Sequence, residues 1–473
     1  MQTTLEPRMK DVDVDNPETD STVGTNQATT HRRHAGFTEG SVGRHLVKLG
    51  SFMAVGTLTM NVAQLAEAVY LGMVSTEALA AMGFAFPITI TLFAFAGGIG
   101  SGASSVIARA MGAGDRDRVT QLVTHAQFLA IIVGTLLGAI GAIFAEQIVQ
   151  ALGATGIVQD MTIQYLQVYM FGVPFFLLSI VGSTLLRATG SAASPGIIMA
   201  TGSIVQIILG PILIFGWFGI PELGIAGAAW AYVVSRMVSI VLYSVLLIRT
   251  RMMRWTFKGM SSSWSAILHV GGPAIMSGLV MPFSMLIITR LLAGHGHEVV
   301  AGYNVATRVE TMAHMILWSA SSSVEPFIGQ NWGARKYDRV RRALFLTNGF
   351  SLAWGVFTFV LMLLIGEYVV SLIDDNQVVV DVASSFFLII PLSIGFMGIM
   401  QIATSSFNAR GLPMPALIIS VVRTVVIYVP LAILADRYWG YVGIFIATAV
   451  TNVVVGIIAW YWNQQSVKSK SDR

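Results

Sequence analysis

Long apolar stretches separated by short polar turns recur along the chain from residue 46 onward. Each is about 20 residues or longer, which is enough for an α-helix to cross a hydrocarbon core of about 30 Å. The apolar runs are continuous and do not alternate with polar residues, so membrane-spanning strands are not expected. The pattern predicts an all-α integral membrane protein with twelve transmembrane helices at residues 47–71, 80–108, 120–144, 163–186, 196–218, 224–248, 265–292, 302–328, 345–365, 382–407, 415–434 and 440–463.

Composition supports a membrane setting. Of the 473 residues, 55% are hydrophobic and only 11% are charged, whereas soluble domains carry about 25% charged residues. The chain has no cysteine, which excludes disulfides and thiolate metal sites. Neither a cofactor nor a nucleic-acid partner is expected, and the expected surroundings are the lipid bilayer.

Basic residues gather in every second loop, and this asymmetry predicts the orientation. The loops after even-numbered helices contain the basic residues Arg109, Arg116, Arg118, Arg187, Arg249, Arg251, Arg254, Lys258, Arg335, Lys336, Arg339, Arg341, Arg342 and Arg410. The other loops are mainly acidic, with Glu77, Glu146, Asp160, Glu222, Glu298, Glu367, Asp374 and Asp375. We therefore expect both termini on the cytoplasmic side of a bacterial inner membrane.

The predicted helices fall into two lobes flanked by polar segments. Residues 1–44 are too polar to bury an apolar core, so they are expected to form a disordered cytoplasmic tail, and they lack the features of a signal peptide. The lobes are expected at residues 45–250 and 265–464. A cytoplasmic linker over 251–264 and a second tail over 465–473 complete the division.

An internal repeat relates the two lobes. GAGDRDRV at 112–119 matches GARKYDRV at 333–340, an offset of 221 residues, and Ala188 and Gly190 fall on Ala409 and Gly411 at the same offset. Because the repeat unit holds an even number of helices, both halves insert in the same direction, related by an axis along the membrane normal. A substrate site between them and alternating access by rocking are expected.

Several motifs resemble the multidrug and toxic compound extrusion transporters. They are EALAAMGFAFPI at 77–88, GASSVIARAMGAGDRDRV at 102–119, LGIAGAAWA at 223–231 and VEPFIGQNWGARKYDRVRRA at 324–343. AGYNVATRVE at 301–310 is most similar to the bacterial branch of the DNA-damage-inducible F proteins. The resemblance covers roughly residues 45–465. It implies two six-helix lobes, a V-shaped central cleft, and export of amphipathic drugs driven by protons or sodium.

The chain departs from the family pattern at positions linked to ion coupling. Where relatives carry an aspartate in the first helix, this chain has Glu67. The asparagine and second aspartate of the fifth helix are replaced by Gln206 and Gly210. A first-helix proline is replaced by Phe52, although its repeat mate Pro273 is present.

Glu67 is the leading candidate for ion or proton coupling. A carboxylate within a membrane is costly and needs a reason to be there. Gln64, three residues earlier, is expected on the same helical face and in the substrate cleft. Gln206 is expected to hydrogen-bond to Glu67 if the first and fifth helices are neighbours. The alternatives are a purely structural hydrogen bond or a position facing outer solvent.

Other intramembrane residues are weaker candidates. Glu310 is either part of an ion or substrate site in the second lobe or a member of a structural ion pair, and Arg308 is a candidate for the cleft. Met60 and Met281 suit a cleft that accepts varied apolar ligands, although ordinary lipid-facing or core packing is the favoured interpretation. Glu325 is expected to be solvated at the interface.

Two glycine- and histidine-rich stretches look like sites but have simpler interpretations. AGGIGSG at 96–102 lies inside a predicted span, so close helix packing is favoured over a phosphate loop. His295, His297 and Glu298 are expected in a solvated turn, not a metal site.

The leading hypothesis is a secondary antiporter that exports cationic or amphipathic organic compounds in exchange for protons or sodium, working as a monomer. A flippase for lipid-linked or polysaccharide precursors is the alternative with the same fold. An integral-membrane enzyme such as a prenyltransferase has no support, because the spaced aspartates that would hold magnesium are missing.

Overall fold

The computed structural model describes residues 36–371 and 376–471, apart from the side chain of Met281. The first half forms six long helices with a short helix between the third and fourth. They are α2 (Val42–Val74), α3 (Thr76–Gly112), α4 (Arg116–Ile143), α5 (Ala145–Ala151), α6 (Gly156–Ala188), α7 (Ser194–Phe215) and α8 (Gly224–Arg249).

The second half follows the same plan with more interruptions. Its helices are α9 (Met260–Ala293), α10 (His297–Gly333), α11 (Tyr337–Ser371), α12 (Gln377–Ile389), α13 (Pro391–Ala409), α14 (Pro413–Val421), the π-helical segment η2 (Val422–Tyr428) and α15 (Val429–Ser471). α12 and α13 are one span bent by 53°, where Pro391 opens the second piece. Gly440 interrupts α15 with φ 59° and ψ −149°, a conformation that glycine adopts without strain.

Within the described residues, nine helices are long and apolar enough to cross a membrane, or ten with the bent pair. One of the nine, the stretch Pro413–Lys470, makes two spans because the chain turns back at Gly440. α10 adds another: its 37 residues can cross, although Arg308, Glu310 and Glu325 lower its hydropathy. The predicted twelve-helix fold in two six-helix lobes is therefore confirmed.

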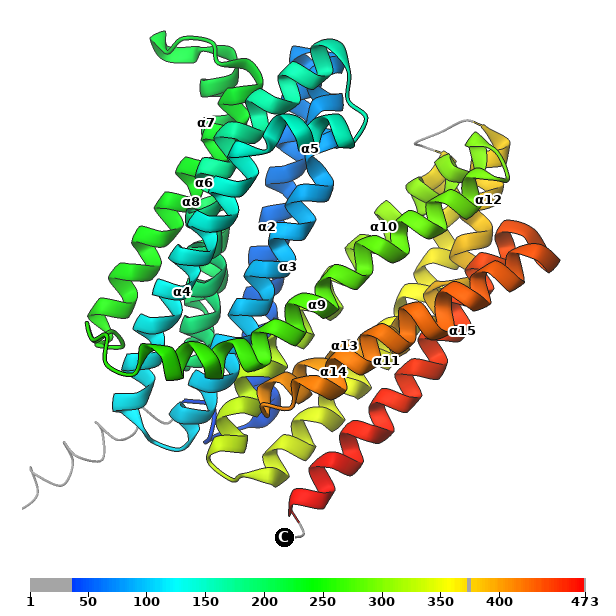
Figure 1. Cartoon of the computed structure of the whole chain (residues 1–473). Helices are drawn as coiled ribbons and strands as arrows, with labels where there is room; N and C mark the ends of the chain where they lie inside the picture. The colour runs from blue at the N-terminus through cyan, green and yellow to red at the C-terminus, as the bar shows by residue number, and fades with distance from the viewer. Residues whose placement is uncertain (1–35, 372–375, 472–473) are drawn as a thin grey trace, which may run out of the picture.

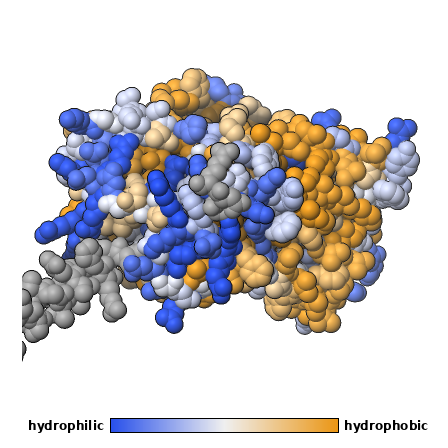
Figure 2. Space-filling model, turned by 90° about the horizontal axis from the view of Figure 1, so that it is seen from below, coloured by the Kyte–Doolittle hydropathy of each residue, from blue (hydrophilic) through white to orange (hydrophobic). Residues whose placement is uncertain are grey.

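The two lobes converge at one end and diverge toward the other (Figure 1). We call the converging end the termini face, because the first described residues and the end of α15 both lie there. Seen from this side, hydrophilic residues gather in the middle of the molecule and hydrophobic residues cover a broad flank (Figure 2). Each lobe has its own apolar core, the first centred on α3, α4 and α6 and the second on α10, α12 and α15.

Glycines allow the lobes to touch backbone to backbone. A Cβ at Gly98 would overlap Ile275 of α9, and one at Gly102 would overlap the Ile267 carbonyl. The prediction that AGGIGSG serves helix packing is confirmed, and its partner is the first helix of the other lobe. At the termini face the repeat mates Gly112 and Gly333 do the same, since a Cβ on either would overlap the opposite helix.

The expected segment boundaries differ from the structure at three places. α2 begins at Val42 and Phe37 is 2% exposed, so packed structure begins before residue 45. α9 begins at Met260, within the expected linker 251–264, and α15 extends to Ser471, through most of the expected tail. Polar helix ends outside a membrane cost little, so a hydropathy pattern does not mark them. Residues 1–35 of the expected tail lie outside the described residues.

Candidate functional site

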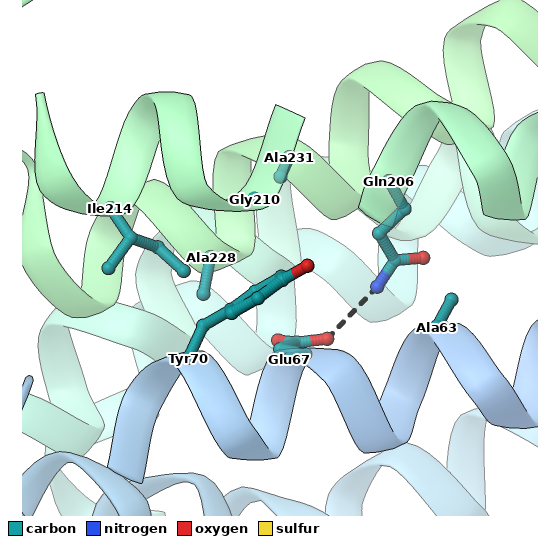
Figure 3. A pocket seen from close by; sticks show the side chains of 8 residues that line it. All are labelled: Ala63, Glu67, Tyr70, Gln206, Gly210, Ile214, Ala228 and Ala231. Atoms are coloured by element: carbon teal, nitrogen blue, oxygen red, sulfur yellow. Dashed lines mark hydrogen bonds between the residues drawn. The ribbon is translucent and has the colours of Figure 1, made fainter. Parts of the chain in front are cut away.

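Glu67 lies inside the first lobe, on α2, and is 9% exposed. One carboxylate oxygen accepts a hydrogen bond of 3.0 Å from the Tyr165 hydroxyl of α6, and the other accepts one of 3.0 Å from Gln206 Nε2 of α7. The side chain therefore ties together three helices of one lobe. The predicted contact with Gln206 is confirmed (Figure 3). The carboxylate points into the lobe and not toward outer solvent.

A small cavity lies beside Glu67. Its walls come from α2, α7 and α8, with Ala63, Tyr70, Gly210, Ile214, Ala228 and Ala231 completing the lining (Figure 3). The free space has room for little more than one water molecule. The cavity can therefore admit a proton carrier or a small ion beside the carboxylate, but not an organic substrate.

The position expected to hold a second carboxylate is filled by an aromatic ring. A Cβ at Gly210 would lie 3.0 Å from two ring carbons of Tyr70. The Tyr70 hydroxyl donates to the Ile207 carbonyl at 3.3 Å, which fixes the ring against α7. Glycine at 210 and tyrosine at 70 therefore fit each other, and Glu67 is left without an acidic neighbour in this cavity.

A row of tyrosines leads away from Glu67 through the lobe. Tyr165 stacks on Tyr169 at a centroid distance of 5.8 Å, and Tyr169 stacks on Tyr232 at 4.8 Å. The Tyr169 hydroxyl donates to the Tyr232 hydroxyl at 3.2 Å. The guanidinium of Arg236 lies 4.8 Å above the Tyr232 ring. A row of stacked tyrosine rings, hydrogen-bonded to Glu67 at one end, thus joins the carboxylate to a buried arginine.

Sequence reasoning missed these tyrosines, although a signal was present. Tyr165 and Tyr169 are four residues apart, as are Tyr232 and Arg236, so each pair shares one face of its helix. Hydropathy patterning treats tyrosine as another apolar residue, which hides a hydroxyl that must find a partner when buried.

The role in a substrate cleft expected for four residues stays a prediction. Gln64 is exposed and lies outside the cavity beside Glu67. Met60 is 7% exposed and packs with Met53 and Met199 inside the first lobe, which is the packing reading. Arg308 is exposed on α10. The side chain of Met281 lies outside the described residues.

Glu310 belongs to a second polar cluster, inside the second lobe. His314 Nε2 lies 3.9 Å from Glu310 Oε1, one helical turn along α10. Arg423 is the electrostatic partner of Glu310 and donates to Asn452 Oδ1 at 2.9 Å. Arg423 lies in the π-helical segment η2, a local rearrangement often found at functional sites. This arrangement fits both readings of Glu310, a structural ion pair and an ion site.

Glu325 is less solvated than predicted for the interface, because its side chain is half-buried. Its Oε1 is buried without a hydrogen-bond partner among the described residues. Ser101 and Ser104 of α3 and Arg187 of α6, all in the other lobe, are its electrostatic surroundings. Convergence of the lobes at this end removes part of the solvent that the sequence led us to expect.

A histidine of the turn between α9 and α10 contacts a carboxylate of α15. His295 Nε2 lies 2.6 Å from Asp436 Oδ1, across the tops of α9 and α15. Over residues 36–371 and 376–471, no group of three histidine or acidic side chains has the arrangement of a metal site.

Two homologous lobes of six membrane-spanning helices, each with a buried polar cluster, define a membrane transporter. The chain belongs to the MatE family, whose model matches residues 53–212 and 273–434. Members of this family are transporters, so the predictions of the family and of a protein that is not an enzyme are confirmed. The finer assignment to the DNA-damage-inducible F branch stays a prediction.

Relatives with given functions share most of the chain. A protein of Shewanella oneidensis described as an FAD transporter is 32% identical over 437 residues, covering 92% of this chain and 96% of the relative. A probable multidrug resistance protein of Bacillus subtilis, YoeA, is 25% identical and covers 88% of this chain and 93% of its own length. The structure of the Vibrio cholerae MATE transporter VcmN in the bent form matches with a TM-score of 0.86 at 27% identity, covering 90% of this chain and 97% of that one.

Proposed function

We propose that this transporter is a secondary active antiporter that exports amphipathic organic compounds in exchange for protons, or for sodium ions, by alternating access of a cleft between its lobes. The observation that carries the proposal is the Glu67 site. A carboxylate that is buried, links its own helix to two others and adjoins a water-sized cavity can bind and release an ion inside the membrane. No cofactor takes part in this cycle.

Protonation of Glu67 changes which hydrogen bonds it can make. An ionised carboxylate only accepts, and here it accepts from Tyr165 and from Gln206. Once protonated, one oxygen becomes a donor, so the Tyr165 hydroxyl must turn its own proton away to accept from it, or the Gln206 amide must turn its oxygen toward it. The contacts of α2 with α6 and α7 then rearrange. Because α2 also packs against α10 of the other lobe, this rearrangement can bias the lobes toward a different relative position.

A proton suits this site better than a metal cation. Hard cations need a shell of several oxygen ligands. Gly210 supplies no side-chain oxygen, and the Tyr70 ring occupies the space beside it. A proton needs only the one carboxylate that is present.

Glu310 is proposed as a second coupling residue, in the other lobe. Its proximity to His314, at 3.9 Å, provides a group that can exchange a proton with it. Arg423 counters its charge when it is ionised. Two carboxylates in different lobes would let each lobe respond to protonation separately.

That the cargo is a cationic or amphipathic drug is supported by relatives named as multidrug resistance proteins. The relative named as an FAD transporter has the higher identity, 32%. A flavin dinucleotide is itself amphipathic, with an aromatic ring system and an anionic diphosphate, so it is the second candidate cargo. Proteoliposomes loaded with FAD or with an aromatic organic cation separate the two, since a cation exporter gives no FAD counterflow.

Orientation and assembly follow from the same reasoning. The basic loops support a cytoplasmic termini face in a bacterial inner membrane. Two lobes in one chain enclose a complete pathway, so we propose a monomer.

The test replaces Glu67 by glutamine, which keeps the shape and removes the charge. In everted membrane vesicles, Glu67→Gln should abolish gradient-driven uptake of the exported compound at unchanged protein level. Glu222→Gln, which alters an exposed carboxylate of the same lobe, is the matched control and should transport normally. Full transport by Glu67→Gln would refute the coupling role.

A further inference from the structure

A short segment ahead of α2 is bound at the junction of the two lobes. Residues 36–41 precede the first membrane helix. Phe37 is 2% exposed, and its ring packs against His45 at a centroid distance of 5.6 Å and against Phe327 of α10 at 6.4 Å. An aromatic residue at the end of a polar segment is thus inserted between helices of opposite lobes.

The backbone of this segment is held by side chains of the second lobe. The four successive carbonyls of residues 37–40 accept hydrogen bonds of 2.7–3.2 Å from Asn331, Lys336 and Arg339. Arg339 alone contacts three of them, and its Nε donates to Asn331 Oδ1 at 2.8 Å. Because residues 36–40 form turns and bends, their successive carbonyls can point toward one group of donors, which binds the segment through its backbone.

Gln330 connects this segment to both lobes. Its Oε1 accepts from the Phe37 N–H at 2.7 Å, and its Nε2 donates to the Ala188 carbonyl, at the end of α6, at 2.8 Å. The side chain is 1% exposed. Removing the segment would leave a buried amide oxygen without this donor, at a site where α10 meets the first lobe.

Among the described residues, segment 36–41 binds at Gln330 and not at the equivalent position in the first lobe. The internal repeat explains the difference. At the offset of 221, Gln330 falls on Arg109, and Ala188 falls on Ala409. Arg109 Nη1 donates to the Arg410 carbonyl of the second lobe at 2.9 Å, so each lobe caps the end of a helix in the other. Arginine has no acceptor, whereas glutamine has one, and only the glutamine side can receive the Phe37 N–H.

We propose that the Gln330 side of the lobe junction is a peptide-binding site whose ligand is the chain's own segment 36–41, and that this bound segment latches the termini face closed. Opening that face requires Gln330 to separate from Ala188 and Gly112, and Gly333 to separate from Arg109. This movement pulls the two walls of the Phe37 site apart. Phe37 therefore has a full set of partners only while the termini face is closed. The latch rests on the proposed alternating access, but its occupancy is measurable without transport.

The test measures the separation of the lobes directly. Because the chain has no cysteine, spin labels on Arg116→Cys and Asp338→Cys, both exposed at the termini face, report the distance between the lobes. Deleting residues 1–40, or introducing Phe37→Ala, should raise the population with long distances by about tenfold, the factor for loss of one buried aromatic side chain. Ser51→Ala, at an exposed position of α2 outside the segment, is the control and should not change the distribution.

A peptide added in trans tests the site itself and guards against simple misfolding. A peptide of residues 33–41 added to the truncated protein should restore the short distance, whereas the same peptide with Phe37→Ala should not. An unchanged distance distribution in both the deletion and Phe37→Ala would overturn the latch, even if Glu67→Gln abolishes transport. A shifted distribution together with normal transport by Glu67→Gln would leave the latch and refute the coupling proposal instead.

Discussion

At the scale of single residues, the account depends on how one carboxylate is held. The cost of a membrane carboxylate was enough to select Glu67, and the family resemblance led to Gln206 as its partner. They did not select Tyr165, because a buried hydroxyl is invisible to an apolar pattern. Nor did they foresee that Tyr70 fills the room beside Gly210, since that fit involves residues 140 positions apart. Which side chains on different helices touch depends on how the helices pack, and a single sequence does not reveal this.

Tyr165→Phe removes one of the two donors to Glu67 and leaves the ring in place. Loss of a hydrogen bond to a buried charged group costs about 1–3 kcal/mol, so we expect roughly a tenfold slower proton-driven exchange. Tyr70→Phe is the control, because it removes a hydroxyl from the same cavity that does not contact the carboxylate. Equal rates for the two variants in a vesicle transport assay would argue against the Tyr165 contact.

Gly210→Asp tests the fit between α2 and α7. The new Cβ would meet the Tyr70 ring at 3.0 Å, and overpacking of this kind costs about 1–3 kcal/mol. We expect a lower Tm in detergent, restored in large part by combining Gly210→Asp with Tyr70→Ala. Additive losses in the double variant would show that the two residues do not share this space.

At the scale of helices, the sequence predicted the spans well where each is a single apolar run. It also included α10 despite its charges, and it separated the last two spans on either side of the turn at Gly440. It did not foresee the break at Pro391 between α12 and α13. The glycine run in α3 was interpreted correctly as a packing surface. The partner helix α9 could not be predicted, because any helix with small residues on one face could pack against these glycines.

Gly102→Leu should separate α3 from α9. The added side chain has no room against Ile267 and Gly271, so we expect less folded protein and a lower Tm. Gly97→Leu is the matched control on the same helix, where a Cβ would meet nothing within 4 Å. Fluorescence-detected gel filtration of both variants gives the comparison, and a normal profile for Gly102→Leu would contradict the packing described.

At the scale of the whole molecule, the internal repeat predicted two lobes with the same number of helices. The structure shows where the two lobes contact each other. Contacts between lobes concentrate at the termini face, through Gly112, Gly333, Arg109 and Gln330. Toward the opposite end the ribbons diverge (Figure 1). A repeat defines equivalent positions, but which of them touch depends on how the lobes are tilted, so the junction could not be derived from the sequence.

The orientation of the molecule is tested by labelling. Single cysteines placed at Ser191, in the turn after α6, and at Glu146, in α5, should react with a membrane-impermeant maleimide from opposite sides of the membrane. Ser191→Cys should react only in everted vesicles and Glu146→Cys only in intact cells or spheroplasts. Reaction of both from the same side would contradict the proposed topology.

The central claim is that an ion gradient acting through Glu67 drives export. The most direct measurement is efflux from proteoliposomes that contain the purified protein, under an imposed pH gradient and, separately, under an imposed sodium gradient. The account predicts concentrative transport with the pH gradient, little with sodium alone, and none in either case for Glu67→Gln. Equal transport by the wild type with and without a gradient, or gradient-driven transport by Glu67→Gln, would contradict it.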